Sequence, residues 1–300
     1  VWNRNTRSGS SRNIRAHYDL GNDFFRTFLD ETLTYSCGIF SDDRTSMRDA
    51  SIEKYDRICK KLELTSDDHV IEIGSGWGGF AIHAASIYGC RVTTTTISVE
   101  QHRFASRLIA EAGLSDRVDV LLKDYRDLEG TYDKLVSIEM VEAVGHQFLE
   151  DYFQKCADLL APHGRAAIQA ITVRDDWYDP KQRQIDFIKR YIFPGSFIPS
   201  VSALSSAAGK TDMRIVHFED QTPHYAETLR RWRAAFMENW PEIRALGFDA
   251  QFRRLWDFYF CYCEGGFDEA ILGCAQIVWA KPASKGVIDA RLHERIEAVA

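Results

Sequence analysis

The pattern of apolar and polar positions along much of the chain indicates strands and helices that follow one another in turn. Short runs rich in apolar and β-branched residues, bounded by glycine and polar residues, predict buried strands at 69–74, 91–98, 117–122, 134–139 and 165–172. Stretches with helical spacing of apolar residues separate them, at 79–88, 99–112 and 146–160. Because helices separate successive strands, the pattern predicts a parallel sheet covered on both faces.

The alternation stops between residues 174 and 208, a stretch rich in aromatic residues that contains three prolines. We interpret it as an inserted lid or substrate wall. A strand at 214–218, two long helices at 225–240 and 250–263, and a last strand at 275–282 follow. We therefore expect an N-terminal helical and aromatic segment at 1–64 that covers the site, a main domain at 65–282 with the insertion, and a tail at 283–300.

Composition and charge narrow the class of protein. The 300 residues are 45% hydrophobic and 27% charged, which is typical of one elaborated globular domain. A net charge of −7 makes nucleic acid an unfavourable partner, because phosphate binding needs clustered Lys and Arg. No apolar run reaches the roughly 20 residues that span a bilayer. The seven cysteines never occur as Cys-x-x-Cys, so no disulfide framework or metal site is predicted. We expect a cytoplasmic protein, and since residue 1 is Val, a fragment of a longer chain.

A glycine-rich turn follows the first predicted strand. Glu72 is followed by Gly74, Gly76 and Gly78 in an acidic-x-Gly-x-Gly-x-Gly pattern, and glycines let the backbone approach a ligand closely. A tight turn with no ligand is the plain alternative. A dinucleotide site would need an acidic residue at the end of the second strand, but threonines stand there and the first acid beyond them is Glu100. The pattern therefore favours S-adenosylmethionine over a nicotinamide cofactor.

The ends of the next two strands carry polar residues as well. Asp124 and Tyr125 follow the third strand, where an adenine could be bound. Glu139 and Glu142 follow the fourth strand, and three residues apart on a helical turn they would share one face. A solvated acidic face is unattractive among so many apolar neighbours. We interpret this segment as part of a functional site.

Seven motifs together resemble the cyclopropane fatty acid synthase family of S-adenosylmethionine-dependent methyltransferases, which includes the mycolic acid cyclopropane synthases. The similarity runs from about Asn13 to Pro282 and is carried by HYDLGNDFF, TYSCGIF, EIGSGWGG, SIEMVEAVGH, YIFPGSFIPS, HYAETLRRWR and GCAQIVWAKP. It implies a class I, Rossmann-like α/β fold with a seven-stranded, mostly parallel sheet, helices on both faces and an inserted lid. It also implies a fatty-acyl-phospholipid substrate.

The resemblance implies the reaction and its site. A methyl group would pass from S-adenosylmethionine to the cis double bond of an unsaturated acyl chain, and the resulting carbocation would lose a proton to bound bicarbonate and close a cyclopropane ring. The residues implied for bicarbonate and catalysis are Cys37, Glu142, Ile171, Tyr225 and Gln169, the last standing where many relatives have His. Those implied for the cofactor are Tyr18, Tyr35, Ser36, Gly74, Gly76, Thr96, Gln101, Asp124 and Tyr125.

Each of these residues also has a plain structural interpretation. Tyr18 and Tyr35 could be core aromatic residues, Tyr225 could expose its hydroxyl at the start of a helix, and Cys37 is more typical of a buried inert thiol. Gln169 can hydrogen-bond an anion but cannot carry a proton, which leaves the route of proton removal open. Three rival functions stay open as well: an acyl methyltransferase with a methylene or methyl-branched product, a small-molecule N- or C-methyltransferase, and a lipid-binding protein without activity.

The predicted partner is a phospholipid acyl chain reached by transient contact with the inner face of the membrane, and a homodimer is left open. Two arginine clusters would favour that contact: Arg4, Arg7, Arg12 and Arg15, and Arg230, Arg231 and Arg233. About half of a set of aromatic residues is expected to line an apolar tunnel. The set comprises Phe24, Phe25, Phe28, Trp177, Tyr178, Phe187, Tyr191, Phe193 and Phe197.

Overall fold

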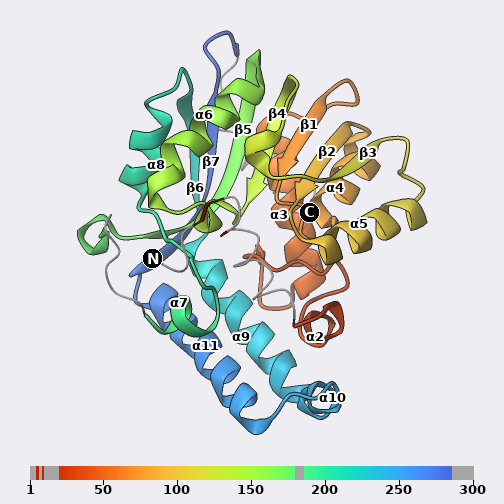
Figure 1. Ribbon diagram of the computed structural model, residues 1–300, viewed down its shortest axis with the longest axis vertical. Coiled ribbons are helices and arrows are strands. Elements are labelled where there is room, and N and C mark those ends of the chain that lie inside the picture. The colour runs from red at the N-terminus through yellow and green to blue at the C-terminus, as the bar shows by residue number, and fades with distance from the viewer. Residues whose placement is uncertain (1–4, 7–8, 10–19, 180–185, 286–300) are drawn as a thin grey trace.

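A computed structural model describes residues 5–6, 9, 20–179 and 186–285 of the chain. Its centre is a seven-stranded sheet of order β3-β2-β1-β4-β5-β7-β6, in which β7 runs antiparallel to both neighbours and the remaining pairs are parallel. The strands are β1 (His69–Ile73), β2 (Arg91–Thr96), β3 (Val118–Leu122), β4 (Tyr132–Ile138), β5 (Leu160–Val173), β6 (Arg214–Asp220) and β7 (Leu272–Ala280). The predicted mostly parallel sheet is confirmed (Figure 1).

Helices connect the strands and extend beyond them. The α-helices are α2 (Asn22–Arg26), α3 (Met47–Leu62), α4 (Gly79–His83), α5 (Val99–Glu111), α6 (Leu149–Leu159), α7 (Phe187–Tyr191), α8 (Val201–Ala208), α9 (Thr222–Glu238), α10 (Trp240–Ala245) and α11 (Ala250–Asp268). A π-helical turn, η1 (Ala84–Tyr88), prolongs α4. Short 3-10 turns are η2 (Tyr125–Asp127), η3 (Val141–Ala143), η4 (His146–Phe148) and η5 (Asp175–Trp177).

The two faces of the sheet are covered by different helices, as the alternation of buried residues requires. Ile71, Leu135 and Ile168 pack against α6 and α8 on one face, and their neighbours Val136 and Ala167 pack against α3, α4 and α5 on the other. Successive side chains of a strand point to opposite faces, so a sheet buried on both sides needs continuous apolar runs. This is why the strands were recognisable in the sequence.

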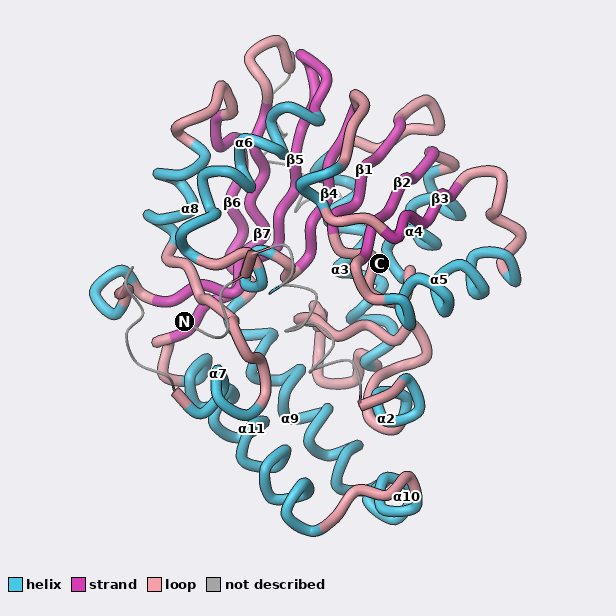
Figure 2. Tube along the Cα trace, in the orientation of Figure 1, coloured by secondary structure: helices cyan, strands magenta, loops and turns pink. Residues whose placement is uncertain are grey.

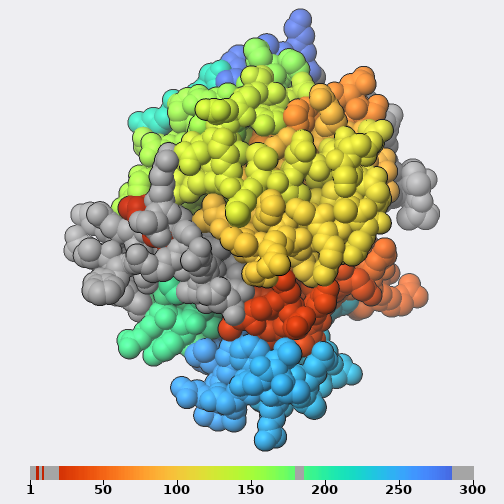
Figure 3. Space-filling model, turned by 45° about the vertical axis from the view of Figure 1, so that its right-hand side comes forward, coloured from red at the N-terminus to blue at the C-terminus, as the bar shows by residue number. Residues whose placement is uncertain are grey.

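A second core lies beyond the sheet. Helices α9 and α11 pack against each other and project away from the strands, with α10 at their far end (Figure 1, Figure 2). Aromatic side chains fill the space between this helical pair and α2, among them Phe24, Trp256 and Phe260, and all three are buried. In the space-filling view the pair forms a separate lobe below the sheet layer (Figure 3).

The predicted helices at 79–88, 99–112, 146–160, 225–240 and 250–263 are confirmed, as are the seven predicted strands. The bounds of helix α3, which lies within the helical segment expected at 1–64, were not predicted. Ser46 and Asp49 carry the capping signal for its start, because the Ser46 side chain accepts a hydrogen bond from the Asp49 backbone N–H. Within the inserted segment, Phe197 and α8 pack in the core beside α6. No helix in the described part of the chain is both long and apolar enough to cross a membrane.

Candidate active site

A cavity of about 1060 Å³ opens at the carboxyl ends of the parallel strands. The glycine turn after β1 and the ends of β2, β3 and β4 form one wall. The opposite wall comes from α9, α11 and the segment after β5, through side chains that include Leu229, Tyr259 and Phe267. In open α/β sheets ligands bind in this crevice. One cavity therefore joins a polar turn to an apolar, aromatic wall.

The glycine turn is built for close approach of a ligand. Gly74, Gly76 and Gly78 have φ values of +99°, +49° and +95°, which side chains with a Cβ rarely adopt. The Gly74 and Ser75 N–H groups both donate to the Thr95 carbonyl, at 3.1 and 2.9 Å, and this fixes the turn against β2. A Cβ at Gly76 would meet no atom within 4 Å, and Gly76 lines the cavity. The space above this turn is therefore open to a bound group.

Polar side chains around the turn are held in place by neighbours. Thr96 Oγ1 donates to Gln101 Oε1 at 2.9 Å, and Asp124 forms a two-pronged ion pair with Arg126, at 2.8 and 2.6 Å. Of the nine residues predicted for the cofactor, eight line this one cavity: Tyr35, Ser36, Gly74, Gly76, Thr96, Gln101, Asp124 and Tyr125. The ninth, Tyr18, lies outside the described residues.

Glu72 lines the same wall and supports a positively charged cofactor. Its carboxylate is buried, and its Oε2 has no hydrogen-bond partner among the described residues. Burial disfavours the charged carboxylate and raises the pKa of Glu72 to about 8. A bound cation beside this carboxylate would offset the cost of burying its charge. S-adenosylmethionine carries an ammonium and a sulfonium group and no phosphate. The residues present fit such a cofactor.

A second cluster is centred on Glu139, immediately after β4. Glu139 Oε1 accepts hydrogen bonds from the Cys37 backbone N–H at 2.9 Å and from Gln169 Nε2 at 2.8 Å. Glu139 Oε2 accepts a hydrogen bond from the Tyr225 hydroxyl at 2.6 Å. Burial and the charge of Glu139 raise the pKa of Tyr225 far above its usual range, so the phenol stays a donor. The chain thus brings distant segments together on one carboxylate.

Glu142 lies nearby on the cavity wall. Its Oε1 accepts a hydrogen bond from the Ile171 backbone N–H at 2.6 Å, and its Oε2 has no partner among the described residues. Burial, together with the charge of Glu139, raises the pKa of Glu142 to about 8. The expectation that the two glutamates share a helical face is wrong, because Glu139 has φ +49° and precedes the short turn η3 that carries Glu142.

The residues expected to hold bicarbonate meet in space, but they do not fit that ion. Three of them, Cys37, Gln169 and Tyr225, donate to the carboxylate of Glu139. Cys37 and Gln169 are absent from the cavity wall, whereas Glu139 lines it, so the carboxylate stands between these donors and the cavity. In this structure a side chain of the protein therefore occupies the donors that were expected to hold bicarbonate.

The apolar wall differs from the predicted one. About half of the nine aromatic residues were expected to line the tunnel, and three of them, Trp177, Tyr178 and Phe193, line the cavity. Others, including Phe24, Phe25 and Phe28, belong to the second core. The apolar contribution of α9 and α11 was not predicted. Their apolar positions at helical spacing look the same whether they face a core or a cavity.

The predicted arginine cluster on α9 is already paired with acidic groups. Arg230 forms ion pairs with Glu227, Glu264 and Asp268, and Arg233 pairs with Asp257 at 2.6 Å. Arg231 pairs with Glu227 at 2.6 Å. These partners weaken the attraction for anionic lipid that the sequence suggested. Of the N-terminal cluster, Arg4, Arg7, Arg12 and Arg15 lie outside the described residues.

A glycine turn after the first strand, polar side chains at the next strand ends and a sheet of this order define a class I S-adenosylmethionine-dependent methyltransferase. A family model described as mycolic acid cyclopropane synthetase matches residues 5–277, and the chain belongs to this family.

Named relatives agree with the family. The chain is 42% identical over 92% of its length to tuberculostearic acid methyltransferase UfaA1 of Mycobacterium tuberculosis, covering 66% of that protein. It is 34% identical over 92% of its length to cyclopropane-fatty-acyl-phospholipid synthase of Escherichia coli K12, covering 70% of that protein. The chain therefore spans about two thirds of the length of these relatives. The crystal structure of mycolic acid cyclopropane synthase CmaA1 with SAH and CTAB has a TM-score of 0.84 and 29% identity, over 90% of this chain and 98% of that one.

Proposed function

We propose that this enzyme transfers a methyl group from S-adenosylmethionine to the cis double bond of an unsaturated fatty acyl chain of a phospholipid, and that the product is a cyclopropane ring. The observation that carries the proposal is the single cavity, in which the glycine turn faces an apolar wall with buried carboxyl groups between them. A greasy chain can lie along such a wall while its double bond meets the cofactor.

Each part of the cavity has a role in this proposal. Bound S-adenosylmethionine would supply an electrophilic methyl group. Gly76, Gln101 and Asp124 would position it, and Glu72 would face its positive charge. Tyr225 and Phe267, stacked at 4.3 Å between ring centres, would present aromatic surface to positive charge that develops on the acyl chain. Because the wall is largely apolar, water would be kept from that charge.

A second product is favoured by one observation. UfaA1, to which the chain is 42% identical, is named as a tuberculostearic acid methyltransferase and not as a cyclopropane synthase. The same methyl transfer, followed by proton loss from a different carbon, would give a methylene branch instead of a ring. A small-molecule methyltransferase is less well supported, because it would not need so long an apolar wall.

Mass spectrometry and proton NMR of the lipid product test both candidates. The chain is incubated with S-adenosylmethionine and vesicles of a dioleoyl phospholipid, and the fatty acids are then recovered. We expect a gain of one CH₂ per reacted chain, with loss of olefinic signals and appearance of the upfield signals of a cyclopropane. The same mass gain with new methylene olefinic signals would support the branched product. No mass gain would refute the lipid function.

The lipid would be reached from the inner face of the cytoplasmic membrane, and an aromatic patch on α7 and α11 would make the contact. The patch consists of Phe187, Tyr191, Phe258 and Tyr262. Tyr191, Phe258 and Tyr262 are exposed, and Tyr262 also lines the cavity. Exposed aromatic groups beside the cavity would let an acyl chain leave the bilayer without crossing much water. The N-terminal segment would cover the cofactor, and a homodimer stays a prediction.

A further inference from the structure

Glu139 is placed where the backbone does not favour it. It follows the last residue of β4, its N–H donates to the Gln169 carbonyl at 2.8 Å, and its φ is +49°. This left-handed conformation is easy for glycine and unfavourable for glutamate. A side chain with a Cβ at such a position is often retained for function. The first question is therefore what the carboxylate contributes.

The surroundings of the carboxylate supply a direct answer. Its two oxygens accept hydrogen bonds from the Cys37 N–H, the Gln169 amide and the Tyr225 hydroxyl, the groups that were expected to bind bicarbonate. Bicarbonate and a glutamate side chain both present a planar –CO₂⁻ group to hydrogen-bond donors. The carboxylate of Glu139, a group of the protein itself, therefore already accepts the hydrogen bonds of these donors.

One oxygen of this carboxylate remains available to the cavity. Oε1 accepts the hydrogen bonds of Cys37 and Gln169 and a longer one from the Cys274 thiol at 3.9 Å, while Oε2 accepts only that of Tyr225 among the described residues. An ionised carboxylate has about four lone-pair sites, two on each oxygen. Oε2 therefore has an unused lone-pair site, and the Glu139 side chain lines the cavity.

Glu142 is the competing candidate, and its environment argues against it. Two neighbouring buried carboxyl groups do not both ionise easily. Burial raises the pKa of Glu139, but its hydrogen-bond donors and the nearby Lys54 cation counteract that rise, whereas Glu142 has only the Ile171 N–H as a donor. Burial and the charge of Glu139 raise the pKa of Glu142 to about 8, so near neutral pH Glu142 keeps its proton.

We propose that Glu139 is the general base of the reaction and takes the place of a bound bicarbonate ion. The inference rests on the proposed function. After methyl transfer the acyl chain carries a positive carbon. A neighbouring C–H bond then breaks, its electron pair forms the third bond of the ring or a new double bond, and the proton moves to Oε2 of Glu139. Charge and atoms balance without a further reactant, and the proton leaves to solvent before the next turnover.

Two substitutions and one matched control test the base. Glu139→Gly empties the position without backbone strain, and Glu139→Gln keeps the volume but cannot accept a proton in the same way. Glu63→Gly is the control, because Glu63 also has a left-handed backbone, with φ +54°, and does not line the cavity. Each protein is assayed on dioleoyl phospholipid vesicles with S-adenosylmethionine, in buffer freed of carbon dioxide and in the same buffer with added bicarbonate.

We expect the wild-type rate to be the same in both buffers, and the Glu63→Gly rate to be equally indifferent to bicarbonate. Glu139→Gly should lose about 100-fold or more of the rate without bicarbonate, and added bicarbonate should restore about tenfold or more of it. Glu139→Gln should be equally slow and should not be rescued, because its amide fills the space. Both variants should bind S-adenosylmethionine by calorimetry and unfold on heating no earlier than the wild type.

The opposite results separate the possibilities. A wild-type rate that collapses in carbon-dioxide-free buffer and returns with bicarbonate would overturn the inference and leave the proposed function intact. A Glu139→Gln variant that works at the wild-type rate would also overturn it. A wild-type chain that binds S-adenosylmethionine but transfers no methyl group to the lipid would refute the proposed function, and the inference with it.

Discussion

Two buried glutamates at the ends of neighbouring strands, Glu72 and Glu142, each have a carboxylate oxygen without a hydrogen-bond partner among the described residues. Proteins seldom leave such atoms unpaired, since an unpaired buried charge is costly. Both side chains line the cavity, so a bound molecule can supply what the fold does not. The site thus contains two buried carboxyl groups whose missing hydrogen bonds a bound ligand would supply.

The effect of Glu72 on stability can be predicted from its pKa. Burial raises that pKa from 4.5 to about 8, so the folded chain keeps a proton that the unfolded chain has already released over this range. Stability of the wild type should therefore fall as the pH rises from 5 to 8. The glutamine of Glu72→Gln cannot ionise. The free energy of unfolding of this variant should therefore rise, relative to that of the wild type, by roughly 1 kcal/mol per pH unit over that window.

Urea unfolding without cofactor, repeated at several pH values, measures this difference. Glu100→Gln is the matched control, because Glu100 is exposed on α5, and its difference from the wild type should vary little with pH. A Glu72→Gln difference that stays constant from pH 5 to 8 would contradict the assigned burial effect.

At the level of elements, one line of polar side chains crosses three adjacent strands behind Glu139. Gln276 on β7 lies opposite Gln169 on β5, and Glu219 on β6 lies opposite Gln276. Lys61 Nζ donates to Gln276 Oε1, Gln276 Nε2 donates to Gln169 Oε1 at 3.0 Å, and Gln169 Nε2 donates to Glu139. Each amide thus fixes the orientation of the next.

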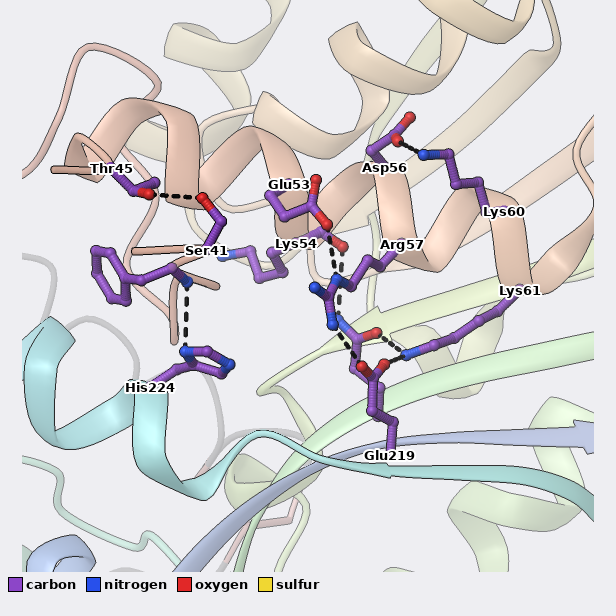
Figure 4. A network of polar contacts seen from close by, with 12 residues as sticks. Ser41, Thr45, Glu53, Lys54, Asp56, Arg57, Lys60, Lys61, Glu219 and His224 are labelled. Atoms are coloured by element: carbon purple, nitrogen blue, oxygen red, sulfur yellow. Dashed lines mark hydrogen bonds and ion pairs between the residues drawn. The ribbon is translucent and has the colours of Figure 1, made fainter. Parts of the chain in front are cut away.

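The outer end of this line is held by ion pairs. Glu219 pairs with Lys61 and, at 2.6 Å, with Arg57, and Arg57 pairs in turn with Glu53 at 2.7 Å (Figure 4). Lys61 and Arg57 come from α3, so this helix anchors the line from one face of the sheet. A lysine ammonium group donates hydrogen bonds but accepts none. Each hydrogen bond of the line is therefore donated in the same direction, from Lys61 toward the cavity.

Removal of Gln276 should therefore act on the rate and leave cofactor binding alone. In Gln276→Leu the Gln169 amide loses its orienting partner, and Glu139 loses a well-placed donor. We expect kcat to fall by roughly tenfold, by analogy with the loss of other outer hydrogen bonds, with unchanged affinity for S-adenosylmethionine. Steady-state kinetics and calorimetry measure the two quantities.

Gln221→Leu is the matched control for that substitution. Gln221 is also buried, but its side-chain amide has no partner among the described residues, and it does not line the cavity. Its replacement should leave kcat unchanged and should not lower the unfolding temperature. Equal losses of kcat in both variants would mean that the line of amides has no special part in the reaction.

How far the sequence predicted these elements depends on what each one packs against. Strands buried on both faces give apolar runs, and a glycine turn gives a spacing, so the sheet and the cofactor wall were predictable. Within the helical segment expected at 1–64, the bounds of helix α3 were missed because its polar face obscures the apolar spacing, despite the cap at Ser46. The part played by Glu139 was also missed, since only the fold brings Cys37, Gln169 and Tyr225 to one carboxylate.

At the scale of the whole molecule, the helical lobe of α9, α10 and α11 lies beside the cofactor-binding sheet (Figure 2). Residues of both parts line one cavity. The sheet carries the polar wall, and α9 and α11 carry much of the apolar one. The aromatic patch on α7 and α11 continues that apolar wall toward the outside. Under the proposed function, the lobe, more than the sheet, would select the lipid.

Replacement of two exposed members of the patch should weaken contact with membranes. In a Tyr191→Ser, Phe258→Ser double variant we expect binding to anionic phospholipid vesicles to fall by roughly tenfold, because two side chains can no longer enter the interface. Co-sedimentation with the vesicles measures it. Ile87→Ser is the control, since Ile87 is 66% exposed on η1 and lies outside the patch. Unchanged binding by the double variant would contradict this role.

The line of amides behind Glu139 has one more consequence for the catalytic cycle. Primary amides do not relay protons, so this line offers no exit for a proton delivered to Glu139. With the base assigned to Glu139, the proton gained in each cycle would depart through the mouth of the cavity. The enzyme would then be ready for its next substrate only after the modified lipid has moved out of the way.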